Sequence, residues 1–248
     1  MSVAVEPSIS RRDRMPAGAV EALRDCERCS IRPASVCSAL THADLHRFES
    51  LGQQVILPRR AVLFSEGQPT EAVYNVTSGV VRLSRLLVDG SRQVVGFGLP
   101  GDFLGLPVDE RYSFSADASE PLTACRFSRQ LFSTFMDERP HFMRRVCDST
   151  TRNLDLARDQ MILLGHPDAK TRVAAFLINM RERWSRIRAV SATVSLPMGR
   201  QDIGDFLGLS IATVSRLLNR LAREGLILIV PRGVRVLDLP RLQRLAGV

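Results

Sequence analysis

The sequence predicts an α+β protein built from three consecutive parts. Between residues 48 and 130, short apolar runs alternate with turn residues, a pattern typical of an antiparallel, jelly-roll-like β-roll. An apolar seam of helical period then continues for about six turns, which indicates one long helix. The last third contains two short amphipathic helices followed by a hairpin, the arrangement of a winged helix-turn-helix.

Length and composition allow one large domain or two small ones. The chain has 248 residues, of which 45% are hydrophobic and 24% charged, as in an ordinary globular protein. No apolar run reaches the roughly 18 residues of a membrane helix, and the N-terminus lacks the apolar stretch of a secretory signal. We therefore expect a cytoplasmic protein with no membrane partner. In that reducing compartment, cysteines serve as ligands or reactive thiols more often than as disulfides.

The first domain is expected to span residues 23–138, after a disordered start. Residues 1–22 are polar, contain two prolines and lack periodicity, so we predict that they are disordered. Gly67, Gly79 and the pair Asp89-Gly90 mark turns between the apolar runs that follow. The expected strands are Gln54–Leu57, Ala61–Phe64, Ala72–Val76, Val80–Leu87, Gln93–Gly98, Tyr112–Ala116 and Leu122–Phe127.

A long helix is expected over residues 139–165, ended by Gly165 and Pro167. Its narrow apolar seam between charged residues predicts a coiled-coil contact with the same helix of a second subunit. Packing of the seam on its own domain is the alternative. Arg158, close to this seam, would repel its own copy across the two-fold axis. The residues expected at the subunit interface are Phe142, Val146, Thr150, Leu154, Ala157, Arg158, Met161 and Leu164.

The C-terminal domain, residues 166–248, carries the positive charge of the chain. Of the net charge of +8, residues 170–248 contribute +9, from fourteen basic and five acidic residues. This asymmetry favours a polyanionic partner, with a solvated basic surface as the alternative. A helix is expected over residues 168–184. The first helix of the following pair breaks at Gly208, Ser210 is a good N-cap for the second, and a hairpin over residues 226–237 forms the wing.

The outer face of the second helix presents short polar side chains and arginines near its N-terminus, the end that meets base edges in a helix-turn-helix. An arginine can bind O6 and N7 of guanine, which contributes about 1–3 kcal/mol of discrimination. A generic amphipathic helix pair explains neither the break at Gly208 nor the hairpin. The expected contacts to double-stranded DNA are Arg200, Ser210, Ala212, Thr213, Ser215, Arg216, Asn219 and Arg220.

Three cysteines, Cys26, Cys29 and Cys37, form a C-x2-C-x7-C run near the N-terminus. Thiolates are preferred ligands of iron–sulfur clusters and of zinc, and a site of four thiolates needs one more cysteine. Cys125 lies in an expected strand and could face a docked N-terminal arm. Cys147 lies in the long helix and is more simply interpreted as a small buried residue. We expect Cys125 to be the fourth ligand.

Residues 199–227 resemble the winged helix-turn-helix of the CRP/FNR superfamily of bacterial transcriptional regulators, through Asp202–Leu209 and Thr213–Leu218. The turns of the expected β-roll and Met161–Leu164 resemble those of the same superfamily. The resemblance implies a homodimer on an inverted-repeat DNA site, with Ser215 and Arg216 reading bases. Ala212 stands where FNR-type helices usually carry glutamate, which implies an altered operator.

The same resemblance implies a trigger and a partner. Oxygen sensors of the FNR branch hold a [4Fe–4S] cluster with an N-terminal group of cysteines and one cysteine of the β-roll, and Cys26, Cys29, Cys37 and Cys125 match those positions. The implied cluster is oxygen-labile, and its loss weakens the dimer and releases DNA. The turn around residues 88–92 resembles the surface that family activators present to RNA polymerase. The implied polymerase contacts are Val88, Asp89, Gly90, Ser91 and Arg92.

Other functions fit less well. Structural zinc or a thiol redox switch would use the same cysteines, and His42 and His46 could offer nitrogen ligands to zinc, although an exposed helix face explains them more simply. Residues 105–116 do not reproduce the phosphate-binding run of cyclic-nucleotide receptors. The chain has no P-loop, G-x-S-x-G or metalloprotease motif, and its cysteine spacing differs from that of radical enzymes. We therefore do not expect an enzyme.

Overall fold

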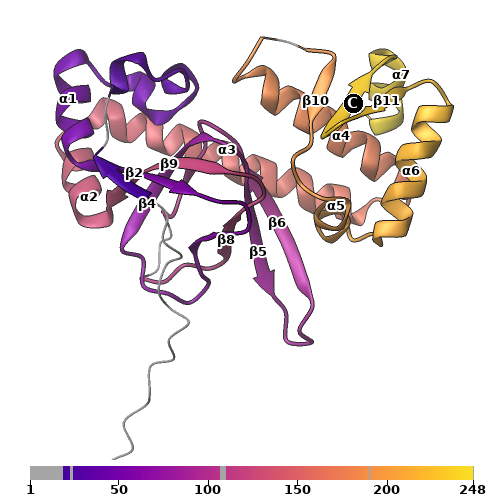
Figure 1. Cartoon of the computed structure of the whole chain (residues 1–248), viewed down its shortest axis with the longest axis horizontal. Helices are drawn as coiled ribbons and strands as arrows, with labels where there is room; N and C mark the ends of the chain where they lie inside the picture. Colours follow the sequence, from indigo (N-terminus) through magenta and orange to yellow (C-terminus); the bar gives the residue numbers. More distant parts are fainter. Residues whose placement is uncertain (1–18, 23–24, 107–109, 190, 248) are drawn as a thin grey trace, which may run out of the picture.

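The computed structural model describes residues 19–22, 25–106, 110–189 and 191–247. Figure 1 shows a β-roll with its covering helices at one end of the molecule and a second, mainly helical domain at the other, with α3 running behind both. The expected α+β class is confirmed. Residues 1–18 lie outside the described part, whereas Ala19–Ala22 forms strand β1, so the prediction of disorder is wrong for these four residues. The reason is main-chain pairing with an open edge, since Val20 lies opposite Val55.

The β-roll consists of two antiparallel sheets. Apolar side chains between them, including the fully buried Leu57 and Leu122, form its core. One sheet has the order β1-β2-β9-β4-β7, with β2 at Gly52–Leu57, β9 at Leu122–Ser128, β4 at Ala72–Ser78 and β7 at Phe103–Leu104. The other has the order β3-β8-β5-β6, with β3 at Val62–Phe64, β8 at Ser115–Ala118, β5 at Val81–Leu86 and β6 at Arg92–Gly98.

One expected strand is misplaced. Residues 112–116 were expected as a strand, but β8 begins at Ser115. Tyr112 precedes it and serves as a core residue of the loop. Its ring stacks on Phe64 at 4.0 Å between centroids, and its hydroxyl donates to the carbonyl oxygen of Ala72 at 2.7 Å. Apolar character alone therefore did not distinguish a strand residue from a loop residue that fills the core.

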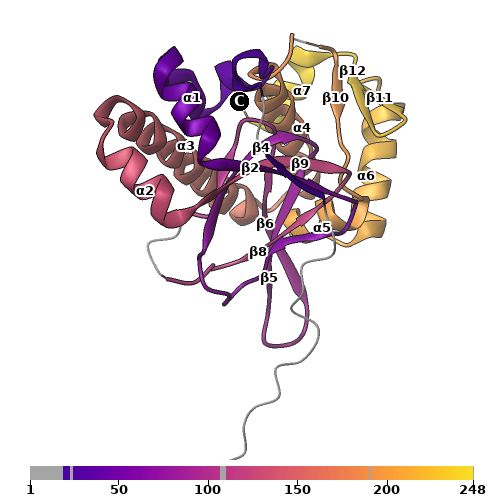
Figure 2. The ribbon, with the colours of Figure 1, turned by 60° about the vertical axis from the view of Figure 1, so that its left-hand side comes forward.

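A cluster of aromatic rings attaches three helices to the outer face of the first sheet. These helices are α1 (His42–Ser50), α2 (Arg129–Asp137) and α3 (Pro140–Gly165). Phe48 of α1 stacks on Phe127 of β9 at 4.1 Å, and Phe142 of α3 contacts the rings of Phe132 and Phe135. Figure 2 shows α1 and α2 beside the start of α3. These buried rings fix the position from which α3 departs.

The long helix α3 is confirmed, but its seam divides into two parts. Phe142 and Val146 are buried in the aromatic cluster of their own domain, so the prediction that they contact a second subunit is wrong. A side chain enclosed by its own domain has no surface left for a partner. Beyond these two residues the seam is uncovered: Leu154 is 47% exposed and Met161 is 64% exposed. Thr150, Ala157, Arg158 and Leu164 are exposed as well.

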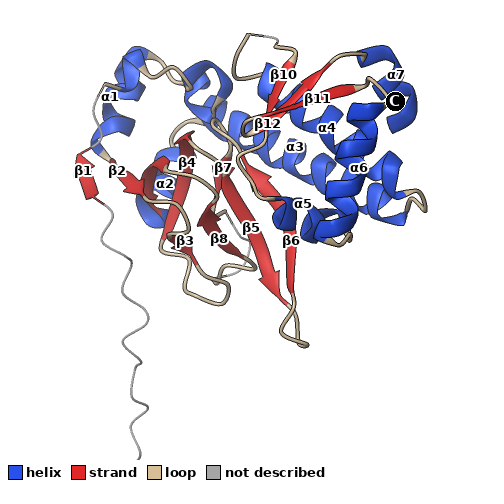
Figure 3. Cartoon of the chain, turned by 45° about the vertical axis from the view of Figure 1, so that its right-hand side comes forward, coloured by secondary structure: helices blue, strands red, loops and turns tan. Residues whose placement is uncertain are grey.

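The C-terminal domain has the expected winged helix-turn-helix, with additional elements. Its helices are α4 (Ala169–Ser185), α5 (Arg200–Leu207), α6 (Ile211–Arg223) and α7 (Leu239–Ala246). The wing consists of β11 (Ile227–Val230) and β12 (Gly233–Val236), and β10 (Thr193–Ser195) adds to β12 (Figure 3). Trp184 ties α4 to this sheet, because its indole N–H donates to the carbonyl oxygen of Ser195 at 2.9 Å. Among the described residues, no helix is long and apolar enough to span a membrane.

The two domains are joined by a network of arginines and aspartates. Arg82 of β5 pairs with Asp117 at 2.6 Å and also with Asp202 of α5. Arg92 of β6 reaches Asp202 at 2.9 Å and Asp205 at 2.7 Å. Beside these charges, Phe97 packs on Phe206 with 5.3 Å between ring centroids. Helix α5 therefore lies against β6, and the orientation of the DNA-binding domain depends on buried charge pairs (Figure 3).

Replacing Asp202 with alanine is expected to lower the free energy of unfolding by about 3–5 kcal/mol. The change leaves two arginines without their shared carboxylate in a mostly buried interface. It also removes the acceptor of the Gly199 N–H, which starts α5. Asp155→Ala is the matched control: its pair with Arg158 is exposed, and its loss should cost at most about 1 kcal/mol. Urea denaturation of both variants measures the difference, and equal effects would exclude this role of Asp202.

Candidate functional site

The four predicted cysteine ligands come together where the N-terminal arm docks on the β-roll. Cys26 and Cys29 lie in and beside the short helix η1 (Cys26–Arg28), and Cys37 lies in η3 (Val36–Ala39). Cys125 lies in β9, opposite Gln54 on one side and Asn75 on the other. Leu122 of the same strand faces the roll interior, whereas Cys125 faces the aromatic cluster under the arm. Alternation along a strand thus places Cys125 on the face that the arm covers.

The arm is ordered by a hydrogen bond within it and by contacts with two other parts of the chain. Ser35 begins η3 by accepting a hydrogen bond from the Cys37 N–H at 3.2 Å. Gly101, with φ +93°, lies directly beneath the arm, where a Cβ atom would come within 3.1 Å of the carbonyl oxygen of Ala34. Ser38 of η3 accepts a hydrogen bond from Arg145 of α3 at 3.1 Å. The cysteine-bearing segment therefore contacts both the β-roll and the long helix.

Burial suppresses ionisation of the thiols of Cys26, Cys37 and Cys125. It is the main cause that raises the pKa of Cys26 to about 12 and that of Cys37 to about 11. The pKa of Cys125 is also raised, by burial and then by the charges of the three other thiols. Such mutual effects arise only between neighbouring groups. The free thiols of Cys26, Cys37 and Cys125 are therefore protonated at neutral pH, and a metal centre that binds them must displace protons.

The four sulfurs are spaced more widely than the ligand atoms of a single zinc ion. Among the described residues, no three cysteine sulfurs lie within 4.8 Å of one another. A tetrahedral zinc ion with Zn–S bonds of about 2.3 Å would hold its sulfurs about 3.8 Å apart. Asn75, which the sequence analysis did not single out, is buried beside this space, with its Nδ2 atom 4.0 Å from the Cys37 sulfur. Its Oδ1 atom has no hydrogen-bond partner among the described residues.

Cys147 does not belong to this group. The prediction that Cys147 is a small buried residue is wrong, because its side chain is exposed. Its neighbours Phe142, Val146 and Ser149 occupy the buried face of α3, and the helical period turns Cys147 away from them. It therefore lies on a different surface from Cys26, Cys29, Cys37 and Cys125.

The second helix of the helix-turn-helix, α6, has the expected start. Gly208 ends α5 in the left-handed conformation, and the Thr213 N–H donates to the Ser210 hydroxyl at 3.2 Å. Gly204 of α5 is required for the close packing of the turn, because a Cβ atom there would lie 2.4 Å from the carbonyl oxygen of Leu209. The local sequence of the turn thus determines where α6 begins and how it is oriented relative to α5.

The outer face of α6 carries most of the residues predicted to contact DNA. Val214, Leu218 and Leu221 are buried against the domain core. On the opposite side, Arg216 donates to the Thr213 hydroxyl at 3.3 Å, and Arg220 pairs with Glu224 at 3.0 Å. The remaining predicted contacts are half-buried or exposed: Arg200, Ser210, Ala212 and Asn219 are exposed, and Thr213 and Ser215 are half-buried.

The five residues predicted to contact RNA polymerase also fall into two groups. Val88, Asp89, Gly90 and Ser91 are fully accessible at the tip between β5 and β6. Asp89 tightens this turn by accepting hydrogen bonds from the N–H and hydroxyl of Ser91. Arg92 differs from these four residues, because Asp202 and Asp205 of the same chain engage its guanidinium and leave its side chain 32% exposed. Its guanidinium instead connects the two domains.

A cavity of about 910 Å³ lies between the β-roll, α3 and α4. Its lining is mainly apolar and includes Leu104, Phe114 and Leu163. Among the described residues that line it, Arg183 is the only arginine or lysine, and it pairs with Asp102 at 2.7 Å. The guanidinium most suited to bind a phosphate is thus already neutralised.

Comparisons with known proteins place both domains. Residues 171–245 match the Crp-like helix-turn-helix domain, and residues 54–139 match the cyclic nucleotide-binding domain. The chain is 49% identical over 232 residues to the transcriptional activatory protein AadR of Rhodopseudomonas palustris, covering 94% of this chain and 97% of AadR. It is 48% identical over 222 residues to the nitrogen fixation regulation protein FixK of Bradyrhizobium diazoefficiens, covering 90% and 94%. The solved structure of FixK2 from Bradyrhizobium japonicum superposes with a TM-score of 0.72 at 34% identity, covering 78% of this chain and 96% of FixK2.

Proposed function

Because the chain belongs to the CRP/FNR family of transcriptional regulators, we propose that it is an activator whose binding to DNA depends on an oxygen-labile [4Fe–4S] cluster. The observation that carries this proposal is the convergence of Cys26, Cys29, Cys37 and Cys125 under the docked arm. A homodimer in the cytoplasm would bind an inverted-repeat DNA site and contact RNA polymerase through the hairpin tip, residues 88–91. The name of AadR states transcriptional activation and that of FixK states regulation of nitrogen fixation, each for that protein.

The cysteine site fits a cluster in several respects. Four thiols converge, and no three of their sulfurs lie as close to one another as the ligand atoms of a single tetrahedral zinc ion. The buried amide of Asn75 can turn its N–H groups toward thiolate sulfur, a hydrogen bond that tunes the reduction potential of iron–sulfur centres. When bound, the cluster supplies an inorganic core that oxygen destroys. The role of the protein is to hold the arm closed around it, through the close approach of Ala34 to Gly101 and the hydrogen bond between Arg145 and Ser38.

The cysteine site lies next to the start of α3, the helix through which the dimer would form. Cys26 and Cys125 share one apolar cluster with Phe142 and Val146 at the start of α3. A second connection is the hydrogen bond between Ser38 and Arg145. Release of the arm removes these contacts and loosens the start of α3, whose second half exposes the apolar seam. A coupling free energy of about 1–3 kcal/mol, ordinary for allosteric proteins, is enough to shift a weak dimer equilibrium.

Anaerobic purification tests the proposal. We expect a brown protein with four iron and four sulfide ions per chain, which bleaches in air and loses its affinity for operator DNA at the same rate. A colourless protein with one bound zinc ion would contradict the cluster and favour a structural metal. Bleaching without any change in DNA affinity would separate the cluster from regulation.

Base reading is assigned to Arg216. Arg216→Ala should weaken binding to the operator by about 5–150-fold, equivalent to 1–3 kcal/mol, and reduce discrimination against non-specific DNA. Arg223→Ala, on the last turn of the same helix, is the comparison: an arginine that contacts phosphate contributes equally to all sequences. Fluorescence anisotropy with operator and scrambled duplexes measures both. An unchanged ratio of the two affinities in Arg216→Ala would refute base reading by this residue.

Control by a cyclic nucleotide is not part of the proposal. The domain match at residues 54–139 describes the fold of the β-roll, while the arginine in the cavity is paired with Asp102. We expect operator affinity to be the same with and without cyclic AMP. A rise in affinity upon adding the nucleotide would reverse this expectation.

A further inference from the structure

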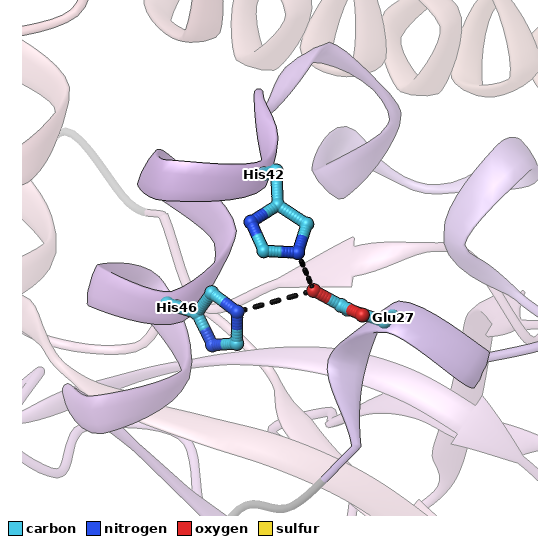
Figure 4. A group of neighbouring side chains, drawn as sticks. All are labelled: Glu27, His42 and His46. Carbon is cyan, nitrogen blue, oxygen red and sulfur yellow. Dashed lines mark ion pairs between the residues drawn. The ribbon is translucent and has the colours of Figure 1, made fainter.

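A group of metal-ligating side chains lies on the surface of the cysteine-bearing arm, separate from the four thiols. Among the described residues, Glu27, His42 and His46 are the three that each place one ligand atom within 4.8 Å of the others. Figure 4 shows the Nε2 atoms of both imidazoles directed at the same oxygen of Glu27, at a distance of 3.1 Å for His46. We propose that these three side chains form a second metal site, for a divalent first-row cation such as Zn²⁺.

The fold presents the two histidines on a rigid element. His42 and His46 are one helical turn apart on α1, and their rings meet edge to face with 4.6 Å between centroids. The opposite side of α1 is anchored by Leu45 and Phe48, which are buried completely. Because this anchored side cannot rotate, the histidines must face outward. Glu27 then reaches them from η1, where it lies between the thiol ligands Cys26 and Cys29.

The donor set suits zinc. Neutral imidazole nitrogen and carboxylate oxygen bind Zn²⁺ at about 2.0–2.2 Å, which places tetrahedral ligand atoms about 3.4 Å apart. The side chains are 74%, 58% and 42% exposed for His42, His46 and Glu27, so their rotamers can adjust to that spacing. Three protein ligands leave a fourth position for water. Asp44, on the same helix, is not part of the set, because Arg139 binds it at 2.6 Å.

Occupancy would tie the cysteine turn to α1. An ion that joins Glu27 to two residues of α1 immobilises the backbone between Cys26 and Cys29. This consequence rests on the proposed cluster: zinc should then slow the bleaching of the anaerobic wild-type protein in air, and His42→Ala/His46→Ala should abolish that protection. Zinc binding to the three side chains does not depend on the cluster.

Binding is therefore measured first without the thiols. In the full chain carrying Cys26→Ser, Cys29→Ser, Cys37→Ser and Cys125→Ser, calorimetric titration with Zn²⁺ should show one site. His42→Ala/His46→Ala in that background should weaken it by at least about ten-fold, and Glu27→Gln should weaken it as well. His141→Ala/His166→Ala is the matched control and should bind as the parent does. Unchanged affinity in His42→Ala/His46→Ala or in Glu27→Gln would overturn the site.

A second measurement avoids the serine substitutions. In the metal-free wild-type chain, Co²⁺ bound to cysteine gives thiolate-to-metal charge-transfer absorption, whereas Co²⁺ bound to imidazole and carboxylate does not. His42→Ala/His46→Ala should lower the bound cobalt by one equivalent and leave the charge-transfer absorption unchanged. An equal stoichiometry in both proteins would overturn the proposal. Iron-free anaerobic protein that still binds this equivalent would refute the cluster and retain the second site.

Discussion

Replacing Cys125 with serine is expected to remove nearly all iron from the anaerobic protein and to abolish the response of DNA binding to air. Cys125 is the cysteine that the β-roll contributes to the site, so without it the proposed cluster could no longer link the arm covalently to the sheet. A serine hydroxyl of similar size should preserve the packing but is a poor ligand for iron. DNA affinity under anaerobic conditions should fall by about 5–150-fold, the effect of losing a coupling of 1–3 kcal/mol.

Cys147→Ser is the matched control for this experiment. It changes the same atom on the exposed face of α3, away from the other thiols. We expect its iron content, absorption spectrum and air sensitivity to equal those of the wild type. Iron retained in Cys125→Ser but lost in Cys147→Ser would show that the fourth ligand comes from the helix, and iron retained in both would leave the site with three cysteines.

Two substitutions along α3 should separate the stability of the fold from dimerisation. Phe142→Ala is expected to cost about 3–5 kcal/mol of unfolding free energy, because its ring is completely buried among Phe48, Phe132 and Phe135. Met161→Glu should leave the stability of the monomer within about 0.5 kcal/mol, since its side chain is 64% exposed. It should nevertheless dissociate the proposed dimer, because a carboxylate would enter an apolar seam against its own copy.

Denaturation of the cluster-free protein measures the free energy of unfolding. Sedimentation of the anaerobic protein bound to DNA measures whether the protein is a dimer. Leu154→Glu, about two turns earlier on the uncovered half of α3, should behave like Met161→Glu. A dimer that survives Met161→Glu and Leu154→Glu would place the subunit interface elsewhere. A Phe142→Ala protein as stable as the wild type would contradict the buried aromatic cluster.

The local elements were predictable because short-range patterns specify them. Apolar alternation predicted most strands of the β-roll, and the change to a helical period predicted α3. Gly208 and Ser210 located the turn of the helix-turn-helix, since a left-handed residue and an N-cap act within a few residues. The candidate cysteines were identified in the same way, from the type and spacing of their side chains.

The relations between distant segments were not predictable in this way. His42 and His46 are recognisable in the sequence as possible zinc ligands, but nothing there connects Glu27 with them, and docking of the arm on α1 brings the three together. From the sequence alone, Arg92 resembles a surface residue. In the folded chain, α5 lies against β6 and supplies the two aspartates that pair with Arg92. Phe142 and Met161 occupy one helical stripe, yet the covering rings of α1 and α2 bury the first and leave the second exposed.

The chain alone therefore specifies its elements, its basic C-terminal domain and four cysteines suited to one metal centre. Which half of the long helix is free for a partner, and which charges join the two domains, emerged when those elements packed. The physical reason is range: backbone preferences and side-chain periodicity act over one or two turns. Burial depends instead on which segment, many residues away, covers a given face.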